Sequence, residues 1–150
     1  MPRSNAPLDR DPAAAANCTA LNLRMATRAV SQFYDAAIAE SGLTGTQYSL
    51  LAVASRAGPL PMSRLAGALV MDRTTLSRNL KPLERAGLVT VVPGEDRRSR
   101  QVTVTEAGRA AHDRAKPLWA KAQASVVERL GEDDWAVLIA GLRKAVAAVR

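Results

Sequence analysis

The chain has 150 residues and a formal net charge of +7 at pH 7, so it can bury the core of one domain and favours an anionic partner. One cysteine, Cys18, excludes an internal disulfide framework and a multi-cysteine zinc site, and one histidine, His112, argues against a histidine-based triad or metal site. No apolar run is long enough to cross a membrane, and the first residues lack the apolar core of a secretory signal. We therefore expect a cytoplasmic protein that does not contact a membrane.

The sequence has no motif for catalysis. A phosphate-binding loop, a nucleophile elbow and a metalloprotease motif are all absent. A small enzyme would have only isolated residues such as Cys18 or His112 to work with. We therefore expect no enzymatic activity, no metal and no cofactor.

The first predicted helix is apolar on more than one side. Residues 1–16 are rich in proline and alanine and are expected to form a loose arm. Asn17 is a favourable N-cap for a helix that runs to about Ser41 and is ended by Gly42. A helix this broadly apolar should have two packing partners. Its apolar residues are Leu21, Leu23, Met25, Ala26, Val30, Phe33, Tyr34, Ala37 and Ile38.

Two shorter helices are predicted next. Thr44 and Gln47 fit a capping box, with Leu43 and Tyr48 at the flanking apolar positions, and this second helix should end near Gly58. Pro61 is expected to open a third helix, because a proline at the first helical position loses no hydrogen bond. The third helix should turn Leu65, Ala66 and Leu69 inwards and Ser63 and Arg64 outwards.

The stretch after Asp72 predicts a helix with two distinct faces. Asp72 is a good N-cap and Gly87 a natural left-handed stop, while Pro82 predicts a bend. Leu76, Leu80 and Leu83 form one apolar stripe. The opposite sector is cationic and rich in hydroxyls, which suits phosphates and base edges of DNA, and it consists of Thr74, Ser77, Arg78, Lys81 and Arg85. With the preceding helix it indicates a helix-turn-helix.

A β-hairpin with an arginine-rich tip is predicted behind this helix. Residues 88–92 and 101–105 have the β-branched or alternating pattern of strands. The connection between them holds Arg97, Arg98 and Arg100. A charged tip is often only soluble surface, but directly after a cationic helix-turn-helix we interpret it as a wing that reaches phosphates or a minor groove.

Two long helices complete the predicted fold. Thr105 and Glu106 should cap a helix that runs to Leu130 and bends near Pro117. The acidic residues after Gly131 favour the start of the last helix. The apolar stripe of this helix needs a cover, for which a second copy of the chain is the natural candidate, and it comprises Trp135, Leu138, Ile139, Leu142, Val146 and Val149.

The order and spacing of several segments carry a resemblance to a known family. These segments are Gly42–Thr44 with Gln47 and Tyr48, Leu65–Ala66, Met71–Arg78, Leu83–Val89, Asp96–Arg98 and Val104–Gly108. Together they resemble the MarR family of bacterial transcriptional regulators, over nearly all of the chain after the N-terminal arm.

The resemblance implies a mainly α fold with a small β-wing, that is, a winged helix-turn-helix with N- and C-terminal dimerisation helices. It divides the chain into an arm (1–16), dimerisation helices (17–42 and 106–150) and a DNA-binding region (43–105). It implies a ligand-responsive repressor that binds double-stranded DNA at a pseudo-palindromic operator as a homodimer. The residues expected at the DNA are Ser63, Arg73, Thr74, Thr75, Ser77, Arg78, Lys81, Arg97, Arg98 and Arg100.

The resemblance also implies an effector site between the dimerisation and DNA-binding parts. Tyr34 and Tyr48 offer hydroxyl groups beside apolar surface, Arg24 and Arg28 offer charge for a carboxylate or phenolate, and Trp119 follows Pro117. This set favours a small aromatic or anionic effector over a metal.

Cys18 leaves an alternative open. Some family members sense peroxides through a cysteine near the start of the first helix, held by tyrosines. Tyr34 matches one such tyrosine, but Cys18 lies about two residues too early and Arg24 stands where the second tyrosine would be. A small core or interface residue is the favoured interpretation of Cys18, and a redox-sensing regulator is the alternative. Other rivals are a non-specific architectural DNA-binding protein and a partner-binding module without DNA.

Overall fold

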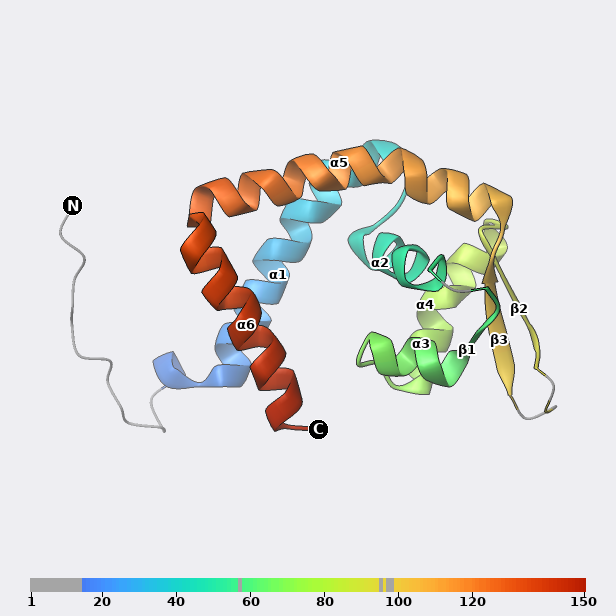
Figure 1. The fold of residues 1–150 in the computed structure, drawn as a ribbon, viewed down its shortest axis with the longest axis horizontal. Coiled ribbons are helices and arrows are strands. Elements are labelled where there is room, and N and C mark those ends of the chain that lie inside the picture. The colour runs from blue at the N-terminus through green and yellow to red at the C-terminus, as the bar shows by residue number, and fades with distance from the viewer. Residues whose placement is uncertain (1–14, 57, 95, 97–98) are drawn as a thin grey trace. The chain divides into compact units, whose positions relative to one another are not determined.

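The computed structural model describes residues 15–56, 58–94, 96 and 99–150. It confirms a mainly helical chain with a small antiparallel sheet (Figure 1). The chain divides into two compact units, residues 1–33 and residues 34–150. The elements are η1 Ala15–Asn17, α1 Thr19–Ile38, η2 Ala39–Ser41, α2 Gly45–Ala54, β1 Leu60–Pro61, α3 Met62–Ala68, α4 Arg73–Arg85, β2 Val89–Pro93, β3 Arg100–Val104, α5 Glu106–Leu130 and α6 Glu132–Ala148.

The described part of the first unit is a short 3-10 turn followed by most of α1. The predicted N-cap, Asn17, is instead the last residue of the 3-10 turn, and α1 begins at Thr19. The side-chain amide of Asn22 donates to the carbonyl oxygens of Ala16 (3.0 Å) and Cys18 (2.9 Å), so the turn is tied to the first helical residues. Apolar side chains along this unit stay exposed, as expected for a helix that needs partners: Leu21, Leu23, Met25 and Val30.

The second unit begins with two helix boundaries that match their predictions. Gly42 ends the first helical segment in the left-handed conformation, with φ of 76°. The capping box of α2 is present: Thr44 Oγ1 accepts from Gln47 N (3.2 Å), and Thr44 N donates to Gln47 Oε1 (2.9 Å). Asp35 Oδ1 also accepts from Gly45 N at 2.6 Å, so α1 is tied to the start of α2.

A strand precedes α3 where only a helix start was predicted. Leu60 pairs with Val102 and Pro61 with Gln101, so β1 forms one edge of the sheet. Pro61 is the N-cap of α3 and not its first residue. A proline is tolerated on an edge strand because its missing N–H removes no hydrogen bond that the sheet needs.

The predicted hairpin is present, and its strands pair from Val89 with Val104 to Pro93 with Arg100. The sheet order is β1-β3-β2, so β3 is central. Its inward residues Val102 and Val104 pack in one core with the apolar faces of the surrounding helices. The most deeply buried side chains of that core are Ile38, Leu50, Leu51, Leu65, Leu76, Leu80, Leu83 and Val102.

The two C-terminal helices begin as predicted. Thr105 Oγ1 donates to Gly87 O (2.7 Å) and accepts from Gly108 N (3.0 Å), so the cap of α5 is joined to the end of α4. Both α4 and α5 continue through their internal prolines, Pro82 and Pro117. Within the described residues, no helix combines the length and the apolar character needed to cross a bilayer.

Gly108→Ala should destabilise the fold by about 2–3 kcal/mol through overpacking. A Cβ at Gly108 would collide with the carbonyl oxygen of Leu88 and lie 2.8 Å from Val104 Cγ1. The Leu88 carbonyl is fixed, since it accepts from Thr105 N at 3.0 Å. Chemical denaturation measures the loss. Gly141→Ala in α6 is the control, because its Cβ would meet open space and should stabilise the helix by about 0.5–1 kcal/mol; equal effects at both positions would contradict the argument.

Candidate nucleic-acid interface

The start of α4 is fixed by Asp72. Its Oδ1 accepts from Thr75 N at 2.8 Å, and its Oδ2 accepts from the Thr75 hydroxyl at 2.6 Å. The hydrogen bond from the Thr75 side chain, followed by that from the Thr75 backbone, lowers the pKa of Asp72 below its ordinary value. The prediction that Asp72 caps this helix is therefore confirmed, and the first turn of α4 is held as a charged, hydrogen-bonded unit.

The two predicted faces of α4 are present. Leu76, Leu80 and Leu83 are buried. Thr74, Arg78, Lys81 and Arg85 are exposed on the other side, while Ser77 and Thr75 are half-buried. The Thr75 hydroxyl already donates to Asp72, so towards DNA it retains only the capacity to accept.

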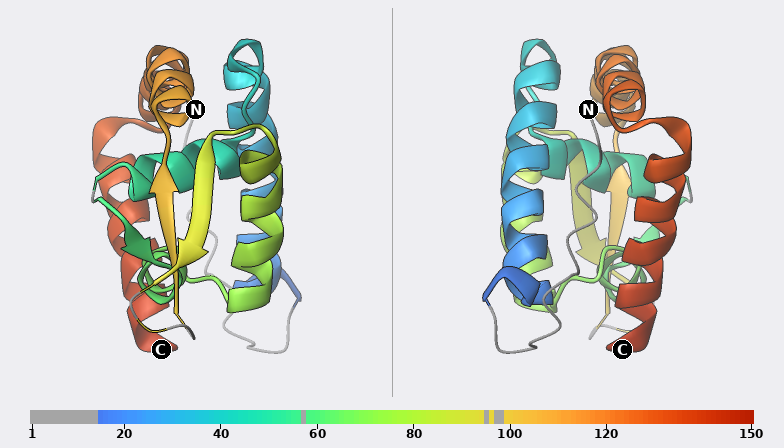
Figure 2. Two further views of the ribbon diagram at one scale, coloured as in Figure 1. Left: turned by 90° about the vertical axis from the view of Figure 1, so that its right-hand side faces the viewer. Right: turned by 90° about the vertical axis from the view of Figure 1, so that its left-hand side faces the viewer.

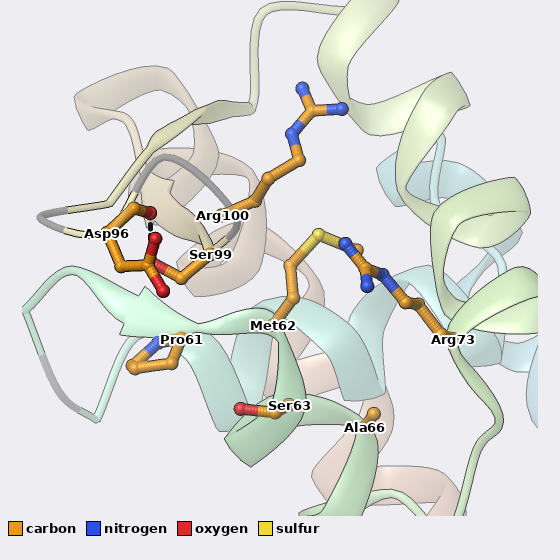
Figure 3. Close-up of a pocket in the computed structure, with 8 residues that line it drawn as sticks. All are labelled: Pro61, Met62, Ser63, Ala66, Arg73, Asp96, Ser99 and Arg100. Atoms are coloured by element: carbon orange, nitrogen blue, oxygen red, sulfur yellow. Dashed lines mark hydrogen bonds between the residues drawn. The ribbon is translucent and has the colours of Figure 1, made fainter.

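A pocket of about 300 Å³ brings together residues of α3, α4 and the hairpin (Figure 3). Three of the predicted DNA-binding residues, Ser63, Arg73 and Arg100, line it. In Figure 3 the Arg73 guanidinium lies beside the Met62 side chain, whereas Arg100 extends away from the other labelled side chains. Arg100 donates to the carbonyl oxygen of Val91 at 3.4 Å. The other lining residues are Pro61, Met62, Ala66, Asp96 and Ser99.

The hairpin is closed by hydrogen bonds at its tip. Ser99 donates to the carbonyl oxygen of Asp96 through its backbone N–H (2.8 Å) and through its hydroxyl (2.7 Å), the latter drawn in Figure 3. Gly94 N donates to Ser99 O at 2.9 Å. The remaining wing candidates, Arg97 and Arg98, lie outside the described residues.

The cations of α4 have no acidic partner in the described part of the chain. The one contact within 4 Å between a basic and an acidic side chain in that part of the chain joins His112 Nδ1 to Asp113 Oδ1 at 3.2 Å, on α5. Arg73, Arg78 and Lys81 therefore have no described carboxylate within 4 Å. Unpaired surface cations of this kind can neutralise phosphates without first breaking an internal salt bridge.

A second group of predicted residues forms an aromatic cluster. The ring centroids of Tyr34 and Trp119 are 6.5 Å apart, and those of Tyr48 and Trp119 are 5.7 Å apart. The Tyr34 hydroxyl donates to Gln123 Oε1 at 2.7 Å. His112 stacks on Tyr48 with centroids 5.1 Å apart. The cluster joins the end of α1 to α2 and α5.

His112 and Gln123 were not among the predicted site residues. With Trp119 they lie at positions i, i+7 and i+11 of α5, which fall on one face at about 100° per residue. This helical spacing is the feature of the sequence from which His112 and Gln123 could have been predicted as neighbours of Trp119. Burial raises the pKa of the Tyr34 and Tyr48 hydroxyls, so both remain neutral at physiological pH.

Comparison with known proteins identifies the family. A model of the MarR family matches residues 41–99. The transcriptional regulator MosR of M. tuberculosis, solved in complex with DNA, is 43% identical, with a TM-score of 0.79 over 89% of this chain and 98% of MosR. The chain belongs to the MarR family. MosR and the other matching proteins are transcriptional regulators, which confirms the expectation that the chain is not an enzyme.

Three further proteins are also similar to this MarR-family chain. The transcriptional repressor CouR, bound to a 23-mer DNA duplex, is 26% identical, with a TM-score of 0.78 over 90% of this chain and 96% of CouR. A CouR from Rhodococcus jostii RHA1, 20% identical with a TM-score of 0.69 over 89% of this chain and 92% of that chain, has been solved bound to p-coumaroyl-CoA. The transcriptional activatory protein BadR of Rhodopseudomonas palustris is 42% identical over 77 residues, 49% of this chain and 44% of BadR, so the match spans less than half of BadR.

The remaining candidates of this MarR-family chain lie in the first unit. Arg24 and Arg28 are exposed on α1. Cys18 is exposed directly before α1, and its carbonyl oxygen accepts from Asn22 N at 3.0 Å. The interpretation of Cys18 as a core residue is therefore wrong for the single chain. Its roles at an interface and in redox sensing stay predictions.

The cap at Asp72 should make the stability of this MarR-family chain depend on pH. Because the folded-state pKa of Asp72 is lowered, its charge stabilises the fold above the ordinary value of 3.8, and this stabilisation is lost as the pH falls through the lower folded-state value. The wild type should therefore be more stable than Asp72→Asn near pH 6, and the difference should shrink below pH 3.8. Denaturant titrations at several pH values measure it. A difference that does not change with pH would show that the charge contributes nothing.

Proposed function

We propose that the protein is a homodimeric repressor that binds a pseudo-palindromic operator and releases it when a small aromatic or anionic effector binds. The observation that carries the DNA part is the exposed outer face of α4. Arg78 and Lys81 lie on that face with the exposed Thr74, and neither has a carboxylate within 4 Å among the residues that the structure describes. MosR and CouR, both solved with DNA, support the same activity.

The chemistry of each proposed DNA-binding side chain suggests which part of the duplex it contacts. Arg78 reads a base edge, because its planar fork can bond the two acceptors of guanine, and Lys81 neutralises a phosphate. Thr74 and Ser77 accept or donate single hydrogen bonds on the same face, and Thr75, whose hydroxyl donates to Asp72, accepts one. Contacts to the DNA backbone come from α3, the start of α4 and the wing, and the residues assigned to them are Ser63, Arg73, Arg97, Arg98 and Arg100.

Repression is favoured over activation by the extent of the matches. The CouR match covers 90% of this chain, and CouR is a repressor. The BadR match covers 49%, although BadR is an activatory protein. A repressor that only occupies its operator needs no additional surface to bind RNA polymerase, whereas an activator does. Repression therefore requires fewer binding surfaces on the protein.

The homodimer is supported by apolar surface that the single chain leaves uncovered. On α6, Leu138 is 45% exposed, Leu142 is 39% exposed and Val146 is 41% exposed, all on one helical stripe. We assign dimerisation to residues 17–42 and 106–150, DNA binding to residues 43–105, and an arm to residues 1–16. A two-fold dimer would place its recognition helices about one DNA turn apart, roughly 10 bp.

The effector is assigned to the aromatic cluster of Tyr34, Tyr48 and Trp119. The cluster joins three helices, so a ligand there can favour one arrangement of α1 and α5 over another. Aromatic rings and neutral hydroxyls fit an aromatic ligand, and Arg24 and Arg28 are the proposed partners of its anionic group. CouR from Rhodococcus jostii RHA1 provides a precedent, since that protein has been solved with p-coumaroyl-CoA.

Footprinting on the DNA that flanks the gene tests the DNA part of the proposal. The expected result is a protected pseudo-palindrome whose half-sites are centred about 10 bp apart. Protection without sequence preference would instead favour the architectural alternative. In vitro transcription from the footprinted promoter then separates repression from activation.

Titration of the protein–operator complex tests the switch. Phenolic acids should release both the wild type and Cys18→Ser from the operator to the same extent, because the ligand binds the aromatic cluster and not the Cys18 thiol. Tyr34→Phe should weaken the response, since it removes the hydroxyl that donates to Gln123. Release by peroxide in wild type that is absent in Cys18→Ser would replace the ligand sensor with the redox sensor.

A further inference from the structure

The turn between α3 and α4 contains an unusual residue. Val70 has φ of 54° and is the one non-glycine residue with positive φ in the part of the chain that the structure describes. Its N–H donates to Gly67 O at 3.3 Å, and Met71 N donates to Ala66 O at 2.9 Å. This pair of bonds is the usual way to end a helix with a left-handed residue, and glycine is the residue normally found in that conformation.

Valine is poorly suited to the left-handed conformation. Its Cβ approaches the following carbonyl group, and its branched side chain increases the crowding. Packing inside the chain does not compensate, because Val70 is 53% exposed. Strained residues of this kind are often found at functional sites. The exposed isopropyl group is therefore a candidate for contact with another molecule.

A cation lies at the same turn. Arg150 Nη1 donates to Gly67 O at 3.3 Å, the carbonyl that also accepts from Val70 N. One bond uses one of the five N–H groups of a guanidinium, so Arg150 retains donors for an anion. Val70 N and Arg150 Nη1 thus bond the same carbonyl oxygen, so an exposed apolar residue and a cation meet at one turn.

The turn lies at the end of the second unit that carries the proposed DNA-binding elements. In both views of Figure 2, the connection between α3 and α4, the start of α4, the end of β2 and the start of β3 all lie towards the lower end. A duplex bound by α4 and the wing would run past this end. An apolar group beside a guanidinium matches a deoxyribose beside its phosphate.

We propose that Val70 and Arg150 form an additional contact to the DNA backbone, in which Val70 packs on a deoxyribose and Arg150 binds the adjacent phosphate. This rests on the proposed DNA-binding function. It adds a third point of contact, separate from the base-reading face of α4 and from the wing. Although α6 as a whole is assigned to dimerisation, a second copy of the chain is a less suitable occupant of this turn, because burying the Arg150 charge in a protein interface would need an acidic partner.

Two variants separate the two contacts. Val70→Gly should raise the midpoint of thermal unfolding by about 2–4 °C through relief of strain, yet weaken DNA binding about three- to tenfold at an unchanged salt slope. Arg150→Ala should weaken binding by a similar factor and lower the slope of log K against log salt by about 0.9 for each lost phosphate contact. Lys116→Ala, an exposed cation of α5, is the control and should change neither quantity.

A duplex with single methylphosphonate substitutions identifies the phosphate. At one position the methylphosphonate should weaken binding of the wild type by the same factor by which Arg150→Ala weakens binding to normal DNA. The Arg150→Ala variant should lose no further affinity when that position is substituted. The proposal is overturned if either variant binds normal duplex like wild type, or if no position shows this non-additivity. Weaker self-association of Val70→Gly in sedimentation would also overturn it, because the turn would then belong to an interface between copies.

The test does not depend on operator recognition. Sugar and phosphate are present in every duplex, so the variants can be compared on any DNA that wild type binds. Failure to find an operator would therefore count against the proposed repressor function, whereas loss of the variant effects would count against the turn contact alone.

Discussion

Replacing Leu138 and Leu142 of α6 together by glutamate should convert the protein to a monomer and weaken operator binding by about 100- to 10,000-fold. The two side chains are 45% and 39% exposed in the single chain and lie on one helical stripe. Charges on that stripe would be buried without partners if a second copy covers it. A monomer loses the second half-site, and with it the gain from simultaneous binding. Sedimentation measures the mass, and a mobility shift measures the affinity.

Val137→Glu is the matched control for this experiment. Val137 is on the same helix and is 72% exposed, but at about 100° per residue it lies roughly opposite the stripe of Leu138 and Leu142. The control should remain a dimer with normal affinity. A wild type that sediments as a well-folded monomer at micromolar concentration would contradict the dimer, and so would a double variant that keeps operator affinity.

The helix starts were predictable because their signals are local. The capping box of Thr44 and Gln47, the Asp72 cap and the Thr105 cap each depend on residues three positions apart. Such bonds form within one turn and need no information from the rest of the chain. The same holds for the alternating strand β3, whose register with β2 follows from the short hairpin connection.

The misplaced elements depend on distant partners. β1 has two residues, too few for a periodic pattern, and it exists because Leu60 meets Val102 about 40 positions later. α1 begins at Thr19 after a 3-10 turn, to which the Asn22 side chain bonds at the carbonyl oxygens of Ala16 and Cys18, and a scan for N-cap residues does not detect these bonds. Both differences arise from contacts that residue type alone does not specify.

The part of the candidate site that lies on one face of α4 was predicted better than the part that depends on contacts between individual side chains. The outer face of α4 follows from helical period and charge, and its exposure agrees with that pattern. In contrast, the involvement of the Thr75 hydroxyl with Asp72 and the stacking of His112 on Tyr48 depend on side-chain orientation. The left-handed conformation of Val70 was not predictable either, because valine is an unfavourable residue there.

Arg78→Ala should weaken binding to the operator by about 1–3 kcal/mol, and by less on random duplex, if Arg78 reads a guanine. Arg78 is exposed on the outer face of α4, one helical turn after Thr74 and N-terminal to Pro82. Lys81→Ala on the same face is the comparison, because loss of a phosphate contact should weaken operator and random duplex to a similar extent.

The base that Arg78 contacts can be located by 7-deazaguanine, which lacks the N7 acceptor. At one guanine of each half-site the replacement should weaken wild type while leaving Arg78→Ala unaffected, since the variant no longer forms that bond. Equal losses on operator and random DNA, together with no guanine that shows this coupling, would show that Arg78 contacts phosphate only. Specificity would then have to come from Thr74 and Ser77 or from the deformability of the operator.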